Sequence, residues 1–258
     1  MRVVITGAAS GIGRAVAEQL AVGDFIAGPH SYLLVDRDEE RLAEVTAALG
    51  ADACAFAADV TADDVGERIA KAAFAHMGGV DGVASNAGII LGGALAEART
   101  ADYDRLFAIN TRAHWLIARA LHEPLKASRG AFVATASMSA HQPTPALSAY
   151  SASKAALLML VRQLSVEWGP DGIRCNTVSP GPTLTAMTAA GYSDPVRLAQ
   201  REAGIPLRKL GTATDVANAI LFLLSPFAGH ISGIDLLVDG GMSNTLMTAS
   251  GAGSGQAK

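Results

Sequence analysis

The chain has 258 residues and a formal net charge of −4, and half of its residues are hydrophobic while only 5% are aromatic. This length suits one large α/β domain or two small ones, and the abundant Gly and Ala favour helices packed closely on a parallel sheet over an aromatic-rich β-sandwich. The weakly acidic charge, without a dense Lys/Arg run, argues against nucleic acid and anionic membrane surfaces as partners.

The cysteines and the hydropathy indicate the compartment. Cys54 and Cys175 are far apart and lack the spacing of a metal site, so we expect two buried thiols and no metal. Met1 leads directly into a strand pattern and not into a signal peptide. The most apolar stretch, residues 219–224, is far shorter than the roughly 18 residues of a membrane helix. We therefore expect a cytoplasmic protein that does not bind membranes.

The first element is a strand at residues 2–6, and a glycine-rich turn and a helical pattern follow it directly. Glycines in such a turn allow positive φ and close approach of a phosphate, while the helix N-terminus offers free N–H groups. The turn could also be plain structural punctuation, because its Gly-x-x-x-Gly-x-Gly spacing differs from the common dinucleotide fingerprint. Its candidate cofactor-binding residues are Gly7, Ser10, Gly11, Ile12 and Gly13.

The second strand, at residues 32–35, ends in Asp36. A carboxylate there can accept hydrogen bonds from the adenosine ribose and repels a 2′-phosphate, which favours NAD over NADP. Arg37 complicates this preference, since a basic residue could meet a 2′-phosphate. The alternative role of Asp36 is the N-cap of the next helix, a role that Asp38 could take instead.

Further strands are expected at residues 53–57, 82–85, 130–136, 172–178 and 234–238, and helices at 102–121, 149–168 and 211–224. Ser137 ends one of these strands, and Tyr150 and Lys154 lie one turn apart on the helix that follows a proline-containing loop. A lone Tyr-x-x-x-Lys arises readily by chance on a surface helix. The motifs elsewhere in the chain therefore decide whether these three residues form a site.

The glycine turn, the sequence Asn86-Ala87-Gly88 and the set of Ser137, Tyr150 and Lys154 occur in an order that resembles the short-chain dehydrogenase/reductase family over residues 2–242. The resemblance implies one Rossmann-like α/β domain, residues 1–248, with a seven-stranded parallel sheet and helices on both faces. It implies hydride transfer between a nicotinamide and an alcohol or carbonyl. Residues 183–210 would form a flap over the substrate, and residues 249–258 a mobile tail.

The resemblance also implies roles for single residues. Asn110 would hold a water in a proton relay, although alone it would be an ordinary helix residue with a satisfied amide. Asp59 could otherwise start a helix, and Pro180-Gly181 could be only a structural turn. Ser85 stands where the family usually has a second Asn before the Asn-Ala-Gly sequence. The expected adenine and nicotinamide contacts are Asp59, Val60, Asn86, Ala87, Gly88, Pro180, Gly181, Thr183 and Thr185, with Arg37 beside the ribose.

The expected mechanism makes Tyr150 the general base, because Lys154 and the charged nicotinamide would lower its pKa from about 10. Ser137 would polarise the substrate oxygen. The mostly apolar substrate contacts expected are Met138, His141, Leu184 and Met187, beside Ser137 and Tyr150. His141 could also act as a second acid/base or stay solvated.

We expect an NAD(H)-dependent dehydrogenase acting on a small, mainly hydrophobic or alicyclic secondary alcohol, assembled as a homo-oligomer (tetramer or dimer). One alternative is a β-ketoacyl-thioester reductase, against which the absence of a basic residue before Gly11 argues. The other is a catalytically silent nucleotide sensor, which would be expected to have lost part of the Ser137, Tyr150 and Lys154 set.

Overall fold

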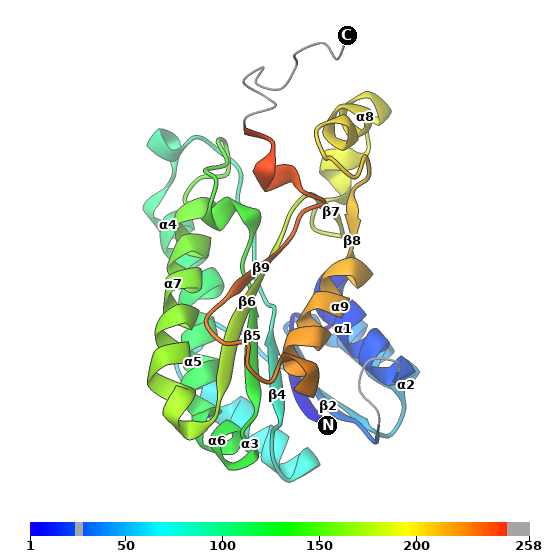
Figure 1. Ribbon diagram of the computed structural model, residues 1–258, viewed down its shortest axis with the longest axis vertical. Helices are drawn as coiled ribbons and strands as arrows, with labels where there is room; N and C mark the ends of the chain where they lie inside the picture. Colours follow the sequence, from blue (N-terminus) through cyan, green and yellow to red (C-terminus); the bar gives the residue numbers. More distant parts are fainter. Residues whose placement is uncertain (24–27, 247–258) are drawn as a thin grey trace.

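Seven parallel strands form the central sheet of the computed structural model, which describes residues 1–23 and 28–246 (Figure 1). Their order is β3-β2-β1-β4-β5-β6-β9, and β7 and β8 form a separate two-stranded ladder. The sheet confirms the expected Rossmann-like fold. The strands are β1 Arg2–Thr6, β2 Ser31–Asp36, β3 Ala53–Ala57, β4 Gly82–Ser85, β5 Ala131–Thr135, β6 Arg174–Pro180, β7 Thr183–Leu184, β8 Gly211–Thr212 and β9 Asp235–Val238.

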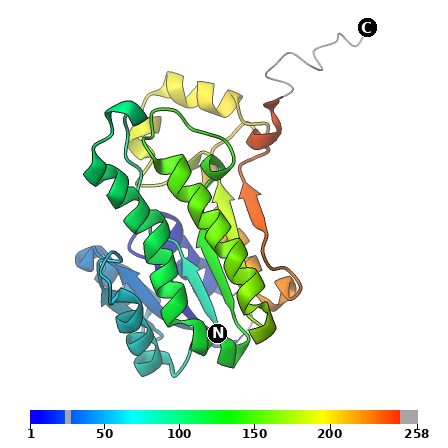
Figure 2. The same cartoon turned by 90° about the vertical axis from the view of Figure 1, so that its left-hand side faces the viewer.

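Helices cover both faces of the sheet (Figures 1 and 2). One hydrophobic core joins the sheet to α1, α2 and α9, and a second joins it to α3, α5 and α7. Strands buried on both faces read as continuous apolar runs, as β1 does with Val3, Val4 and Ile5 fully buried. The helices are α1 Gly11–Val22, α2 Glu39–Leu49, α3 Val65–Met77, α4 Thr100–Phe107, α5 Ala113–Ala120, α6 His122–Ser128, α7 Tyr150–Trp168, α8 Pro195–Ala203 and α9 Ala213–Leu224.

Side-chain capping differs between the helices. Asp38 caps α2 by accepting from the backbone N–H of Arg41, and Thr212 forms a capping box with Asp215 at α9. Helix α1 has no such cap, since the Ser10 side chain makes no capping bond. The first N–H groups of α1 therefore stay available to a ligand.

The helix expected at residues 102–121 is interrupted in the structure. Between α4 and α5 lies a π-helical turn, Ala108–Arg112, with Asn110 at its centre. Single π-turns often occur at functional sites, because the wider turn redirects a side chain. The apolar pattern of the sequence does not reveal this change of pitch, because both flanking segments keep the spacing of an α-helix.

One further expectation differs from the structure. Cys175 is buried, but Cys54 is only partly buried, because β3 is an edge strand of the sheet. The segment 183–210 begins with the short strand β7 and contains α8. The tail expected at residues 249–258 lies outside the described residues.

Within the ranges 1–23 and 28–246, every helix is too short or too polar to cross a lipid bilayer.

Candidate active site

A cavity of about 1040 Å³ lies at the carboxyl ends of the parallel strands. Gly7 follows β1, Asp36 ends β2, Asn86 follows β4, Ser137 follows β5 and Pro180 ends β6, and all five residues line the cavity. Open α/β sheets bind ligands at this edge, where the connections to the two helical layers separate.

The glycine turn forms one wall of the cavity. Gly7 and Gly11 have φ of +68° and +54°, values that other residues rarely adopt. A Cβ on Gly13 would lie 2.2 Å from the carbonyl oxygen of Gly7, so the first turn of α1 packs directly on the end of β1. The glycines leave the backbone of the turn without side chains, and the first N–H groups of α1 have no side-chain cap. These two features suit the binding of a pyrophosphate group.

Asp36 is held against this turn. The backbone N–H of Ala9 donates to its Oδ2 and that of Asp38 to its Oδ1, each at 3.1 Å. Asp38 caps α2, so the structure does not use Asp36 as that cap. The Asp36 carboxylate and the side chain of Arg37 therefore both border the cavity beyond β2.

Asp59, beyond β3, accepts hydrogen bonds from the backbone N–H and the hydroxyl of Thr61, which lower its pKa. It lines the cavity next to Val60. The N-cap of α3 is Asp64, so the alternative role of Asp59 as the start of that helix is not seen.

The Asn86-Ala87-Gly88 segment is tied to β1. The Thr6 hydroxyl accepts from the backbone N–H groups of Asn86 at 2.9 Å and Ala87 at 3.1 Å. The amide of Asn86 lies close to Gly7 and Gly13, and a Cβ on Gly88 would lie 3.4 Å from Lys154 Nζ. All three residues line the cavity. This segment therefore connects the glycine turn to the lysine.

Ser85, which precedes this segment, has a partner of its own. Its hydroxyl lies 2.7 Å from Nδ1 of His114, a ring that is almost fully buried in α5. Burial and the charge of Lys154 lower the pKa of His114 to about 3, so the ring is neutral at physiological pH. A serine–histidine pair thus occupies the position where the family usually has a second asparagine.

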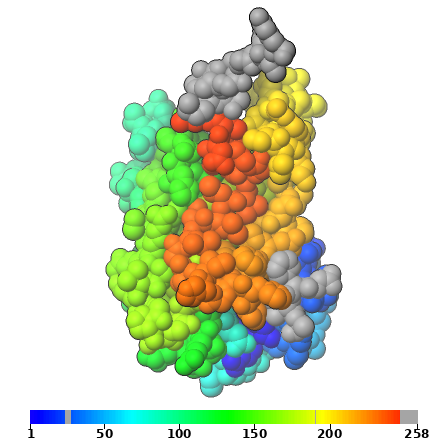
Figure 3. Space-filling view, viewed as in Figure 1, coloured from blue at the N-terminus to red at the C-terminus, as the bar shows by residue number. Residues whose placement is uncertain are grey.

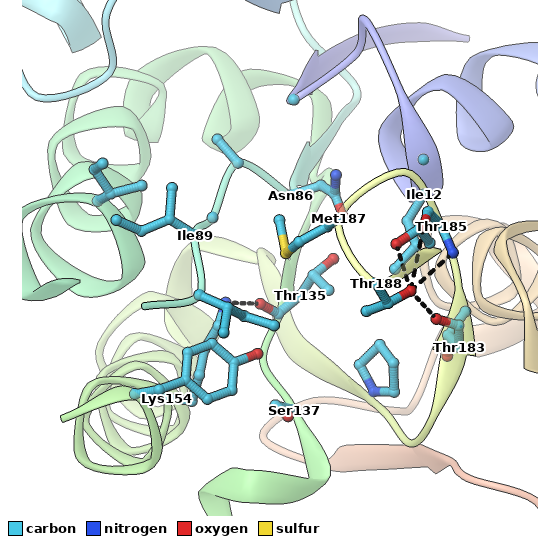
Figure 4. A pocket seen from close by; sticks show the side chains of 18 of the residues that line it. Ile12, Asn86, Ile89, Thr135, Ser137, Lys154, Thr183, Thr185, Met187 and Thr188 are labelled. Atoms are coloured by element: carbon cyan, nitrogen blue, oxygen red, sulfur yellow. Dashed lines mark hydrogen bonds between the residues drawn. The ribbon is translucent and has the colours of Figure 1, made fainter. Parts of the chain in front are cut away.

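Ser137, Tyr150 and Lys154 converge at the other end of the cavity, each less than 10% exposed. Tyr150 is the first residue of α7, and Lys154 lies one turn further on. Lys154 Nζ donates to the carbonyl of Thr135 at 2.7 Å, as Figure 4 shows. Ser137 follows β5, and its Oγ accepts from the backbone N–H of Ser139 at 3.1 Å. Ser137 and Tyr150 are 13 residues apart in the sequence, and the segment after β5 brings them to the same end of the cavity.

Burial sets the charge states of this group. It raises the pKa of Tyr150 above its ordinary value of 10, against the opposing effect of a hydrogen bond with Ser137. Burial also lowers the pKa of Lys154 to about 7. Within the protein alone, the pKa of Tyr150 is therefore raised. The lowering expected from the sequence combines Lys154 with a charged nicotinamide, and it stays a prediction.

Asn110 lies behind this group and is fully buried. Its Oδ1 accepts from the backbone N–H of Ile89 at 2.9 Å, and its Nδ2 donates to the Ile89 carbonyl at 3.0 Å and to Ser153 Oγ at 3.1 Å. The amide thus joins the loop after β4 to α7, and the π-turn supplies the orientation that these three bonds need.

Comparison with known proteins agrees with this geometry. A family model described as enoyl-(acyl carrier protein) reductase matches residues 7–243. The chain is 36% identical to a 2,3-dihydro-2,3-dihydroxybenzoate dehydrogenase of Bacillus subtilis (92% of this chain, 94% of that one). It is 34% identical to a 2,5-dichloro-2,5-cyclohexadiene-1,4-diol dehydrogenase of Sphingobium indicum (93% and 95%). It also resembles a solved 3-ketoacyl-(acyl-carrier-protein) reductase from Brucella melitensis complexed with NADH (TM-score 0.84, 30% identity, 93% and 97%).

The chain belongs to the short-chain dehydrogenase/reductase family. Members of this family use a nicotinamide cofactor, and the relatives named as dehydrogenases support an alcohol oxidoreductase.

In this short-chain dehydrogenase/reductase, the segment after β6 forms part of the cavity wall. The Thr188 hydroxyl donates to the Thr183 carbonyl at 2.6 Å and accepts from the backbone N–H of Thr185 at 3.0 Å (Figure 4). Thr185 lies against Gly11, so this segment reaches the glycine turn. Pro180, Gly181 and Met187 also line the cavity.

The structure places two of the expected substrate contacts outside the cavity lining. His141 turns away, and its Nε2 pairs at 2.6 Å with Asp235 Oδ2, which is nearly buried. Leu184 follows the two-residue alternation of a strand: Thr183 faces inward and is buried, whereas Leu184 is 52% exposed. Met138 and Met187 do line the cavity.

The sequence did not single out several of the lining residues, although Tyr192 and Arg201 lie in the segment 183–210 that was expected to cover the substrate. One group comes from the loop before Tyr150, and the other from the region after β7 and from the end of the described chain. Only the first group carries a local signal, since it directly precedes the Tyr-x-x-x-Lys motif. The residues are Pro143, Thr144, Pro145, Leu147, Tyr192, Arg201 and Met242.

Proposed function

We propose that this chain is an NAD(H)-dependent dehydrogenase that interconverts an alicyclic secondary alcohol and its ketone. The observation that carries the proposal is one continuous cavity with two chemically distinct ends. Asp36 and the glycine turn border one end, and the buried set of Ser137, Tyr150 and Lys154 borders the other. The ring-shaped alcohols in the names of two relatives support the alicyclic class.

The preference for NAD rests on Asp36. Its carboxylate borders the cavity at the end of β2, where it can accept hydrogen bonds from ribose hydroxyls and repels a 2′-phosphate. Arg37 and Arg41 border the same end, and each could favour a phosphate instead. The carboxylate decides in this proposal because two backbone N–H groups fix it against the glycine turn.

The nicotinamide supplies the hydride acceptor in oxidation and the hydride donor in reduction. In oxidation, the Tyr150 phenolate takes the proton of the substrate hydroxyl while the carbinol carbon loses its hydride. Ser137 donates a hydrogen bond to the same oxygen. Lys154, when protonated, stabilises the phenolate, and Asn110 fixes the backbone around Lys154 through Ile89 and Ser153. In reduction, Tyr150 returns the proton to the oxygen of the ketone.

A β-ketoacyl-thioester reductase is the second candidate, favoured by the solved neighbour of that name. The chain has Ser10, and no basic residue, directly before Gly11, which gives less support for the 2′-phosphate of NADPH. A substrate panel separates the two candidates.

The test measures absorbance at 340 nm with NADH and a panel of alicyclic ketones, sugars and acetoacetyl thioesters. The wild type should turn over an alicyclic ketone, and Tyr150→Phe should keep NADH binding while losing at least about 100-fold in kcat. Tyr103→Phe is the matched control, since Tyr103 is 43% exposed and stacks on Phe107 outside the cavity. Substantial turnover by Tyr150→Phe would contradict the mechanism, and turnover of the thioester alone would favour the second candidate.

We also propose a homo-oligomer. Met159 and Val166 on α7 are 59% and 77% exposed, and Trp115 on α5 is 39% exposed, so apolar side chains extend over one helical face. Size-exclusion chromatography with light scattering tests this, and a monomer at micromolar concentration would contradict it.

A further inference from the structure

The acidic side chains of the cavity are all at one end. Asp36, Asp38 and Asp59 are the carboxylates among the described lining residues, and they follow β2 and β3 at one edge of the sheet. Three arginines are near them. Arg37 and Arg41 follow β2, and the charges of Arg37 and Arg105 help to lower the pKa of Asp59.

The substrate end differs, because its basic groups have no carboxylate beside them in the described lining. In the part of the lining that β5, β6 and the end of β9 contribute, the described residues include no carboxylate. Lys154 is one cation there, and it is buried and donates to the Thr135 carbonyl. The other is Arg201, in the last turn of α8.

Contacts beyond α8 fix Arg201 at the substrate end. Ile205 is 1% exposed and lies against Gly240, and the backbone N–H of Leu207 donates to the Gly240 carbonyl at 3.2 Å. Gly240 follows β9, the strand farthest from β2 and β3. Figure 3 shows α8 and its connection next to the segment after β9. The chain directly after α8 is therefore anchored beside the carboxyl end of β9, and Arg201 itself is exposed at the rim of the cavity.

The guanidinium of Arg201 has no protein counterion. Within residues 1–23 and 28–246 it makes no hydrogen bond or ion pair, whereas Arg197, one turn earlier on α8, pairs with Asp194. Arginine is well suited to bidentate binding of a carboxylate. The other described lining residues at the substrate end are uncharged apart from Lys154, and they combine apolar side chains with hydroxyl and amide groups, among them Met138, Leu147, Met187, Met242, Gln142 and Thr144.

We propose that Arg201 binds an acidic group of the substrate, so that the substrate is an alicyclic secondary alcohol bearing a carboxylate. This inference rests on the proposed function and specifies its substrate class. The carbinol lies at Tyr150 and Ser137, and the carboxylate lies at the rim beneath α8. The apolar side chains between these two points contact the ring.

The experiment compares 3-oxocyclohexane-1-carboxylate with its methyl ester as substrates of the NADH-loaded enzyme. The wild type should prefer the acid in kcat/KM. Arg201→Met should abolish that preference by lowering kcat/KM for the acid about 10- to 100-fold, mainly through KM, while the ester changes little. Arg201→Lys should restore part of the preference. Arg197→Met is the matched control on the same helix, and it should retain the wild-type preference.

A second readout does not depend on turnover: the dissociation constant of cyclohexanecarboxylate from the enzyme–NADH complex, measured by calorimetry beside that of the uncharged amide. If Arg201→Met binds the acid more weakly but binds the amide as the wild type does, the inference is supported, even when neither ketone is reduced. Absence of reduction of both ketones would overturn the proposed function. Equal use of acid and ester by the wild type overturns the inference alone. An equal loss of NADH affinity in Arg201→Met also overturns it, because Arg201 would then bind the cofactor.

Discussion

Replacing Gly13 by Ala tests whether the glycine turn is built as the structure describes. The new Cβ would lie 2.2 Å from the Gly7 carbonyl oxygen and 2.7 Å from its carbon, whereas ordinary contact begins at 3.4 Å. Both neighbours are backbone atoms, so α1 and the end of β1 must separate by about 1 Å. Overpacking of this kind costs about 1–3 kcal/mol. For a chain of this size, that lowers Tm by roughly 2–12 °C.

The assay is thermal unfolding with and without NADH, together with the Kd of NADH. Gly13→Ala should lower Tm and weaken NADH binding, because the same shift widens the phosphate cradle. Gly23→Ala is the control: Gly23 has φ +79° at the end of α1, but its Cβ would meet no atom within 4 Å. It should lower stability by about 1–2 kcal/mol without changing NADH affinity. Unchanged Tm and Kd in Gly13→Ala would refute the close packing of α1 on β1.

Three further predictions concern polar and charged side chains. Asp36→Ala should narrow the preference for NAD over NADP in kcat/KM; an unchanged ratio would exclude Asp36 from cofactor choice. Ser85→Ala should lower the free energy of unfolding by about 1–3 kcal/mol, because it leaves the buried His114 ring unpaired, and adding His114→Leu should recover part of this in urea denaturation. Burial lowers the folded-state pKa of Lys154 to about 7, so between pH 7 and 10.5 the unfolded chain holds one proton more. The free energy of unfolding of the wild type, relative to that of Lys154→Met, should therefore rise with pH by up to about 1.4 kcal/mol per pH unit. A difference that does not change with pH would contradict this prediction.

The fold was predictable because its signals are local. Most strands of the central sheet are short apolar runs, although β6 also contains Asn176, Thr177 and Ser179. The resemblance to the family implied the parallel sheet with helices on both faces, and the alternation of strands and helices agrees with it. The turn at Gly7 and the spacing of Tyr150 and Lys154 are also local patterns. The order of these motifs along the chain was enough to predict that these residues belong to one site.

The errors concern side chains whose direction depends on distant residues. His141 turns away because Asp235, 94 residues later, offers it a nearly buried carboxylate. Arg201 reaches the cavity only because Ile205 anchors the end of α8 against Gly240. The π-turn around Asn110 accompanies hydrogen bonds to Ile89 and Ser153, which come from other elements. No pattern within a single element carries such information.

The division of labour along the cavity has a consequence for how such enzymes diversify. The glycine turn, Asp36 and Asp59 border one end of the cavity and come from the first third of the chain, whereas α8 at the other end lies between β7 and β8. Thr185 touches Gly11, so only this point of the segment after β6 reaches the glycine turn. An exchange of residues 189–208 between homologues is therefore expected to change the choice of substrate while the glycine turn and Asp36 keep their contacts.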